Sequence, residues 1–242
     1  MTLRKLKSAG VLILVPLMFA TSSQLASAAP TVTKTLSNQK TFTSWANADS
    51  TSPIFSQPNE HSQIVSHLHY LTSDNLPAVF LVLKSQTGAD GVTWYKIAFS
   101  ARPNGQEGWV LPGNLNPLTV DRTFMLVDLG ARKLTLYKEG KEIFSTPIGV
   151  GRPSLPTPVG HFWVQEEFRS NDPFYGPWAV GTSAYAPSLT EWPGGGVVGI
   201  HGTNQPSLIP GDPSHGCVRL RDSAITELIS ILPIGTPIDI VQ

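Results

Sequence analysis

The chain of 242 residues has one cysteine, so it has no internal disulfide. It also lacks an apolar run long enough for a membrane span: the run near the N-terminus, residues 9–20, is shorter than the roughly 20 residues required. Positive charge is not in excess, since 17 Lys and Arg stand against 17 Asp and Glu. Because nucleic-acid binding depends on clustered Lys and Arg, this composition argues against a nucleic-acid partner.

The first residues have the pattern of an export signal. Arg4, Lys5 and Lys7 precede the apolar run, and Ala26-Ser27-Ala28 fits an A-x-A cleavage site. We therefore expect residues 1–28 to be a secretory signal peptide and the protein to reach the periplasm or cell envelope. The alternative is an uncleaved N-terminal anchor. No cysteine follows the apolar run, so we expect no lipid anchor and no stable membrane anchor after signal removal.

The rest of the chain predicts two β-rich parts. Residues 29–40 are small and polar, as in a flexible leader, and residues 41–118 contain short strands such as Pro77–Leu83 without helical periodicity. The Pro-, Gly- and Asn-rich run 112–117 places a boundary near 117–121. Without the three basic residues of the signal, the remaining chain has 14 basic against 17 acidic side chains, a net charge of about −3.

Residues 121–242 predict a second domain that is also mainly β. Lys133–Lys138 and Lys141–Ile148 flank a Glu139-Gly140 turn, which is typical of a hairpin. A single helix is expected over residues 223–232, because Ile225, Leu228, Ile229 and Leu232 fall on one face and Asp222 is a favourable N-cap.

The lone cysteine lies in the run 214–219, which reads Ser-His-Gly-Cys-Val-Arg. A cysteine nucleophile needs a base within hydrogen-bond reach and surroundings that favour its ionised form. His215 is two positions from Cys217, about 7 Å away in an extended chain, whereas His201 ends an apolar run 16 residues upstream and can lie on a neighbouring strand. We therefore predict His201 as the base of an ionised Cys217 in an open groove. His215 and Gly216 would shape a turn whose backbone N–H groups, with that of Cys217, bind an oxyanion.

This pattern resembles the signature of the L,D-transpeptidases with a YkuD-type catalytic domain, in which a histidine precedes [S/T]-H-G-C-x-[R/N]. The resemblance covers residues 121–242 and includes the run 157–162. It implies Cys217 as nucleophile, His201 as proton acceptor and donor, and the carbonyl of Gly202 as the third partner. It also implies donor and acceptor stem peptides of peptidoglycan as substrates, joined in 3→3 cross-links through a thioester.

Two further residues are predicted to contact substrate. The resemblance assigns Arg219 to the substrate, and a guanidinium suits a carboxylate of the donor stem; the alternative is an ion pair with Asp212 or Asp222. The long loop 168–196 contains several aromatic residues and is expected to form a lid or wall over the cleft, although these aromatics equally suit a cap on the core. Because the family often places a tyrosine at this distance before the base, Tyr185 is predicted as the second contact.

The N-terminal part resembles bacterial SH3-like domains in its Trp94-Tyr95-Lys96-Ile97 run and in Gly108-Trp109-Val110 after an Asn-Gly turn. The predicted fold is thus mainly β: an SH3-like barrel over residues 41–118, followed by a YkuD-type β-sandwich with one helix after the catalytic motif. No cofactor is expected. No metal is expected either, because His67 and His69 have no acidic or cysteine partner at suitable spacing.

Three other functions remain open from the sequence. An L,D-carboxypeptidase would use the same residues with water as acceptor. A general cysteine peptidase is less compatible, because the papain-type context of the cysteine is absent. A non-catalytic wall-binding protein would keep the fold without the reaction.

Overall fold

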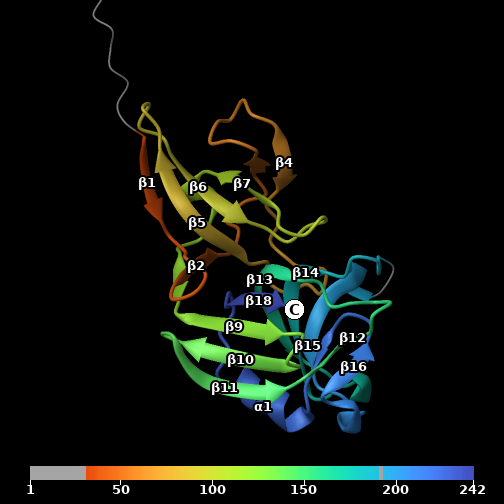
Figure 1. Ribbon diagram of the computed structural model, residues 1–242. Coiled ribbons are helices and arrows are strands. Elements are labelled where there is room, and N and C mark those ends of the chain that lie inside the picture. The colour runs from red at the N-terminus through yellow and green to blue at the C-terminus, as the bar shows by residue number, and fades with distance from the viewer. Residues whose placement is uncertain (1–30, 191–192) are drawn as a thin grey trace, which may run out of the picture.

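The computed structural model describes residues 31–190 and 193–242, and the predicted signal peptide lies outside them. Two sheets dominate the fold, one above the other in Figure 1, and they contain all eighteen described strands. The prediction of a mainly β protein with one α-helix after the catalytic motif is confirmed. No helix within the described ranges has the length and apolar character that a membrane crossing requires.

The N-terminal half forms an eight-stranded sheet in the order β4-β3-β7-β6-β5-β2-β8, with β1 also paired to β5. Its pairings are all antiparallel. The SH3-like identity of this half remains a prediction. Its elements are β1 (Val32–Thr35), β2 (Thr43–Ala46), β3 (Pro53–Phe55), β4 (Ile64–His67), β5 (Phe80–Thr87), β6 (Thr93–Ala98), β7 (Glu107–Val110), the 3-10 helix η1 (Pro112–Asn114) and β8 (Thr119–Asp121).

The C-terminal half forms a ten-stranded sheet in the order β11-β10-β9-β18-β13-β14-β15-β17-β12-β16. Its strands are β9 (Thr123–Asp128), β10 (Lys133–Lys138), β11 (Lys141–Pro147), β12 (Gly149–Gly151), β13 (Gly160–Arg169), β14 (Trp178–Tyr185), β15 (Val197–His201), β16 (Gly211–Ser214), β17 (Val218–Arg219) and β18 (Pro237–Val241). The helical elements are η2 (Pro173–Tyr175), η3 (Pro193–Gly196), η4 (Pro206–Leu208) and α1 (Asp222–Ile229).

Local sequence explains the first hairpin of this sheet. Glu139 and Gly140 both have positive φ, 51° and 78°, which a two-residue turn of type I′ requires. The turn joins β10 to β11 at the Lys138–Lys141 pair, as the sequence predicts. One strand of the N-terminal half differs from its prediction. The sequence predicts a strand over Pro77–Leu83, whereas β5 begins at Phe80 and ends at Thr87.

The ten-stranded sheet folds around one core that reaches from β9 and β10 to the strands next to the cysteine. Met125, Leu134, Val180, Ile200 and Val218 are all at most 1% exposed in this cluster. The strands β15 and β17 form a parallel pair in this sheet, and Ile200 lies opposite Val218. The chain positions that flank the predicted nucleophile and base are therefore held by buried apolar neighbours.

Helix α1 begins at Asp222 and ends at Ile229, so the predicted range 223–232 is too long at its C-terminal end. Asp222 is its first residue and not its N-cap, which is Arg221. The Asp222 carboxylate instead accepts a hydrogen bond from the backbone N–H of Thr203 at 2.9 Å. Ile225 and Leu228 are fully buried, so the apolar face predicted for this helix packs into the core.

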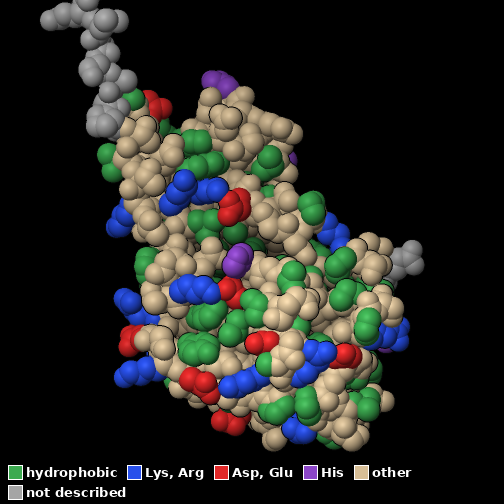
Figure 2. All heavy atoms as spheres, in the orientation of Figure 1, with side chains coloured by type: hydrophobic (Ala, Val, Ile, Leu, Met, Phe, Trp, Pro, Cys, Tyr) green, Lys and Arg blue, Asp and Glu red, His purple; other side chains and the backbone are tan. Residues whose placement is uncertain are grey.

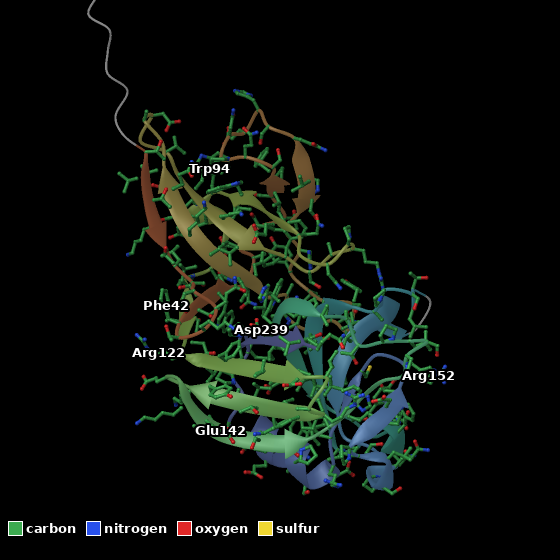
Figure 3. The ribbon with its side chains drawn as sticks, in the orientation of Figure 1. Phe42, Trp94, Arg122, Glu142, Arg152 and Asp239 are labelled. Atoms are coloured by element: carbon green, nitrogen blue, oxygen red, sulfur yellow. The ribbon has the colours of Figure 1, made fainter. Side chains whose placement is uncertain are left out.

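The two halves contact one another directly. Trp163 of β13 is 5% exposed, packs with Val79 and Leu81, and its Nε1 donates to the Val79 carbonyl at 3.1 Å. Asp239 of β18, labelled at the junction in Figure 3, pairs with Lys40 from the N-terminal half. Figure 2 shows basic and acidic side chains interspersed over the visible face of both halves. The junction is thus a packed interface with specific hydrogen bonds.

Candidate active site

Cys217 lies in a sharp turn between β16 and β17. Gly216 has φ of 124°, a backbone conformation that favours glycine. The hydroxyl of Ser214 closes the turn: it accepts from the Gly216 N–H at 3.1 Å and donates to the Cys217 carbonyl at 2.6 Å. Ser214 is 1% exposed, so this bracing is shielded from water. The serine of the motif therefore holds the turn that presents the thiol, a role that sequence reasoning did not assign.

His201 ends β15 and is 1% exposed. Its Nδ1 lies 2.6 Å from the carbonyl oxygen of Gly202. Because a carbonyl only accepts, Nδ1 carries the hydrogen and Nε2 is the basic nitrogen. This is the carbonyl contact that the family resemblance implies for Gly202.

The imidazole of His201 and the thiol of Cys217 meet on one side of Gly199. A Cβ at position 199 would lie 3.7 Å from His201 Cδ2 and 3.9 Å from Cys217 Sγ. The Gly199 N–H also donates to the sulfur at 3.4 Å. The glycine therefore leaves the space in which the two groups come together, and they do not point to opposite sides of the sheet.

The electrostatics of the pair differ from the predicted ionised sulfur. Burial raises the pKa of the Cys217 thiol above its ordinary value, although the Gly199 hydrogen bond and the charge of Arg219 lower it in part. Burial lowers the pKa of His201 to about 4, against a smaller opposing effect of the Gly202 hydrogen bond. Burial thus acts against charge on both groups, and for the sulfur it opposes the predicted ionised form in the free protein.

Arg219 is 3% exposed and extends toward the same turn. Its guanidinium lies over the ring of Phe174, with Cζ 4.6 Å from the centroid, and its Nη1 is 3.3 Å from Gln205 Oε1. Its Nε is buried without a hydrogen-bond partner. The predicted alternative of an ion pair is wrong, because Asp212 pairs with Arg132 at 2.6 Å and Asp222 accepts from Thr203. A buried cation without a carboxylate partner is costly, so this site favours an anionic ligand.

The predicted oxyanion donors need one correction. The N–H of Gly216 is already donated to Ser214 and is not directed at the groove. Burial, followed by the charges of Arg152 and Arg219, lowers the pKa of His215, which lines the groove beside Cys217.

Two cavities meet at the thiol. The first, which we call the Arg219 cavity, has a narrow volume of about 20 Å³. The second, the Glu166 cavity, has a volume of about 200 Å³. They share Tyr175, Val197, His201 and Cys217. The sulfur is therefore reachable from two directions, one with a buried guanidinium and one with carboxyl groups.

Tyr185 lines neither of these two cavities but a third one, together with Glu166 and Val197, so its contact with substrate remains a prediction. Its backbone N–H and carbonyl bond to the side chain of Asn104, both at 2.9 Å, and its ring lies beneath the guanidinium of Arg102. The tyrosine at the site is Tyr175, whose ring meets that of His201 edge to face at a centroid distance of 4.9 Å.

The prediction of one long loop over 168–196 is wrong, because residues 178–185 form β14, and the expected wall over the cleft is present only in part. Phe174 and Tyr175 line the Arg219 cavity, whereas Trp178 packs against the core. The segment that contains Phe174 and Tyr175 makes close backbone contact with the loop that follows His201. A Cβ at Gly202 would lie 2.9 Å from the Gly176 Cα and 2.5 Å from the Asp222 Oδ1. Two distant glycines thus allow the aromatic wall to reach the histidine. Within the described residues, no group of three or more His, Cys, Asp or Glu side chains forms a metal site.

Comparisons with known proteins identify a family and several related chains. The YkuD family, described as the L,D-transpeptidase catalytic domain, matches residues 122–240. The YkuD protein of Bacillus subtilis, named as an L,D-transpeptidase, is 35% identical over 54% of this chain and 73% of its own length. The YkuD protein of Bacillus licheniformis is 37% identical over 54% of this chain and 72% of its own.

Solved structures include similar chains from Enterococcus faecium. The catalytic domain of its L,D-transpeptidase is 28% identical, with a TM-score of 0.38 over 50% of this chain and 98% of that chain. A longer chain of the same enzyme is 26% identical, with a TM-score of 0.39, and the match spans about half of it, 49%. By its sequence relatives, the chain belongs to the YkuD family of L,D-transpeptidases.

Proposed function

We propose that the protein is an exported cysteine acyltransferase that forms or exchanges L,D (3→3) cross-links between peptidoglycan stem peptides. The observation that carries this proposal is the placement of a thiol and an oriented neutral imidazole where two cavities meet. Acyl transfer between two substrates needs access for a donor and an acceptor to one nucleophile. Membership of the family supports the substrate class.

In the first half-reaction, Cys217 acts as the nucleophile and His201 as the base. Nε2 of His201 takes the thiol proton as the sulfur attacks the donor carbonyl, and Nδ1–H stays bonded to Gly202, which stabilises the imidazolium that forms. The leaving D-amino acid receives this proton from His201. A thioester on Cys217 results.

Substrate contacts follow from the charges of the Arg219 cavity. The guanidinium, whose Nε has no hydrogen-bond partner, would bind a carboxylate of the donor stem in its planar fork. With the Gly216 N–H occupied by Ser214, the Cys217 N–H is the candidate donor to the oxyanion. Losing one such donor typically costs about 10²–10³ in rate.

Incubation with a disaccharide-tetrapeptide, followed by intact-mass analysis, tests the proposal. We expect an adduct on the wild-type protein with loss of one D-amino acid, and no adduct on Cys217→Ala. Product analysis then separates the activities: a cross-linked dimer supports the transpeptidase, and a trimmed monomer alone indicates the L,D-carboxypeptidase. Binding to wall fragments without any reaction, unchanged in Cys217→Ala, would indicate the non-catalytic protein.

A further inference from the structure

The Glu166 cavity is built from both halves of the protein. Asp74, from the connection between β4 and β5, and Glu166, from β13, line it together with Cys217 and His201. In Figure 1, β13 and β14 lie next to the N-terminal half, so this opening is at the junction. The N-terminal half therefore contributes a charged side chain to the cavity that contains the thiol.

The carboxyl group of Glu166 is held in place by hydrogen bonds and by close packing. Glu166 is 5% exposed, accepts from the hydroxyl of Thr72, and shares a hydrogen bond with Asp74. A Cβ at position 181 would lie 2.6 Å from Glu166 Oε1, so Gly181 leaves the space that the carboxyl occupies. Among the residues described, no Lys, Arg or His forms an ion pair with Asp74 or Glu166. A buried acid without a cation is expensive unless something else fills that role.

The two cavities differ in the charged groups that line them. The Arg219 cavity contains a buried cation, and the Glu166 cavity contains two carboxyl groups. The remaining walls of the Glu166 cavity include the apolar side chains of Phe168, Val180 and Val197. An acidic end and apolar walls fit an aliphatic chain that ends in a primary amine.

We propose that the Glu166 cavity is the acceptor subsite, in which Asp74 and Glu166 bind the primary ammonium group of the incoming stem and take its first proton. This inference rests on the proposed acyl transfer, and it adds that residues of the N-terminal half select the acceptor. Burial, and then Asp74, raise the pKa of Glu166 to about 7 against the effect of Thr72, so the pair accepts a proton without a large cost near neutral pH.

The atoms of the second half-reaction balance as follows. The acceptor ammonium gives one proton to the carboxylate pair and becomes a neutral amine. Its nitrogen attacks the thioester carbonyl, the C–N bond forms, and the C–S bond breaks. The second proton passes through His201 to the sulfur, which restores the thiol. The protonated carboxyl pair then releases its proton to water.

The test measures how one acyl-enzyme divides between amine and water. The full-length protein is acylated with a disaccharide-tetrapeptide and given Nα-acetyl-lysine amide, and the ratio of aminolysis to hydrolysis products is measured by mass spectrometry. Because both products come from the same thioester, the ratio does not depend on the acylation rate. We expect the ratio to fall roughly tenfold or more in Glu166→Gln and several-fold in Asp74→Asn, as for loss of a charge-assisted contact.

A control variant and the behaviour of the wild-type protein separate this inference from the proposed function. Glu167→Gln, one residue along β13 and outside the Glu166 cavity, should keep the wild-type ratio. A wild-type ratio in both Glu166→Gln and Asp74→Asn, or an equal fall in Glu167→Gln, would overturn the acceptor role. Asp74 is exposed, so its variant gives a result even if Glu166→Gln misfolds. Failure of the wild-type protein to form any thioester would instead overturn the acyltransferase itself.

Discussion

Lowering the pH from 8 to 5 should leave the imidazole of His201 largely uncharged. Burial lowers its pKa from 6.5 to about 4, with the charge of Arg219 acting in the same direction. At pH 6 about 1% of this group would then be protonated, compared with about three quarters of an ordinary histidine. The ring therefore stays neutral at acidic pH, where an unperturbed histidine would already carry a proton on both nitrogens.

Long-range ¹H–¹⁵N spectra of the imidazole rings measure this directly. Six histidines are present, and the His201 signals are identified by their absence in His201→Gln. We expect His201 to keep the shifts of a neutral ring with hydrogen on Nδ1 from pH 8 to 5, while Nα-acetyl-histidine amide in the same tube titrates. A midpoint between pH 6 and 7, or an imidazolium at pH 7, would refute the reasoning from burial.

The same shift has a consequence for folding. The unfolded chain binds a proton on this residue near pH 6.5, before the folded chain does, so the free energy of unfolding falls as the pH decreases from 6.5 to 4. A shift from 6.5 to about 4 corresponds to on the order of 3 kcal/mol. The free energy of unfolding of wild type and of His201→Gln is measured by urea denaturation at pH 7 and pH 4.5. Between these pH values the wild type should lose more stability than the variant, because only the wild type has this histidine.

Three further substitutions test other parts of the structure. Glu167→Gln should raise the free energy of unfolding at pH 8.5 by about 2–3 kcal/mol and change it little at pH 5. Burial raises the pKa of Glu167 to about 7, so the wild-type folded state loses stability as the pH rises from 4.5 through 7. Gly202→Ala should lower the free energy of unfolding by about 1–3 kcal/mol and slow thioester formation, since its Cβ would lie 2.5 Å from Asp222 Oδ1. Arg219→Met should slow thioester formation strongly while the free energy of unfolding stays equal or rises by up to about 2 kcal/mol, because an unpaired buried cation is removed.

Each of these has a clear contrary outcome. For Glu167→Gln, denaturation curves that shift equally at both pH values would contradict the pKa argument. The control for Gly202→Ala is Gly113→Ala, where an added Cβ would have no neighbour within 4 Å; equal losses in both variants would remove the role of the close contact. For Arg219→Met, an acylation rate equal to that of the wild type, measured by intact mass, would contradict the proposed contact with the donor stem. A large loss in the free energy of unfolding would indicate that Arg219 has a structural role.

The parts of the site that were predictable from sequence are those within short segments. The run 214–219 and His201 predict the thiol and its base, because these depend on a turn and one strand pair, and the family resemblance adds the carbonyl of Gly202. The hairpin around Glu139-Gly140 is equally local. These features need only backbone geometry that neighbouring residues impose.

The parts that were not predictable depend on how distant segments pack. Tyr175 and not Tyr185 reaches the histidine because Gly176 and Gly202 approach each other closely, which no pattern of spacing reveals. The resting charge of Cys217 depends on its depth in the groove, and Asp222 bonds to the loop after the base instead of capping α1. Asp74 and Glu166 are 92 residues apart in a chain whose two halves must first dock.

The burial that keeps the Cys217 thiol protonated also governs its fate under oxidative stress. Peroxides react with the thiolate, so a sulfur held in its protonated form is oxidised slowly. The chain has no second cysteine that would capture a sulfenic acid as a disulfide and allow its reduction. Slow reaction of the resting sulfur with peroxide is therefore its main intrinsic protection, and in the proposed reaction the sulfur would become vulnerable when its proton moves to His201.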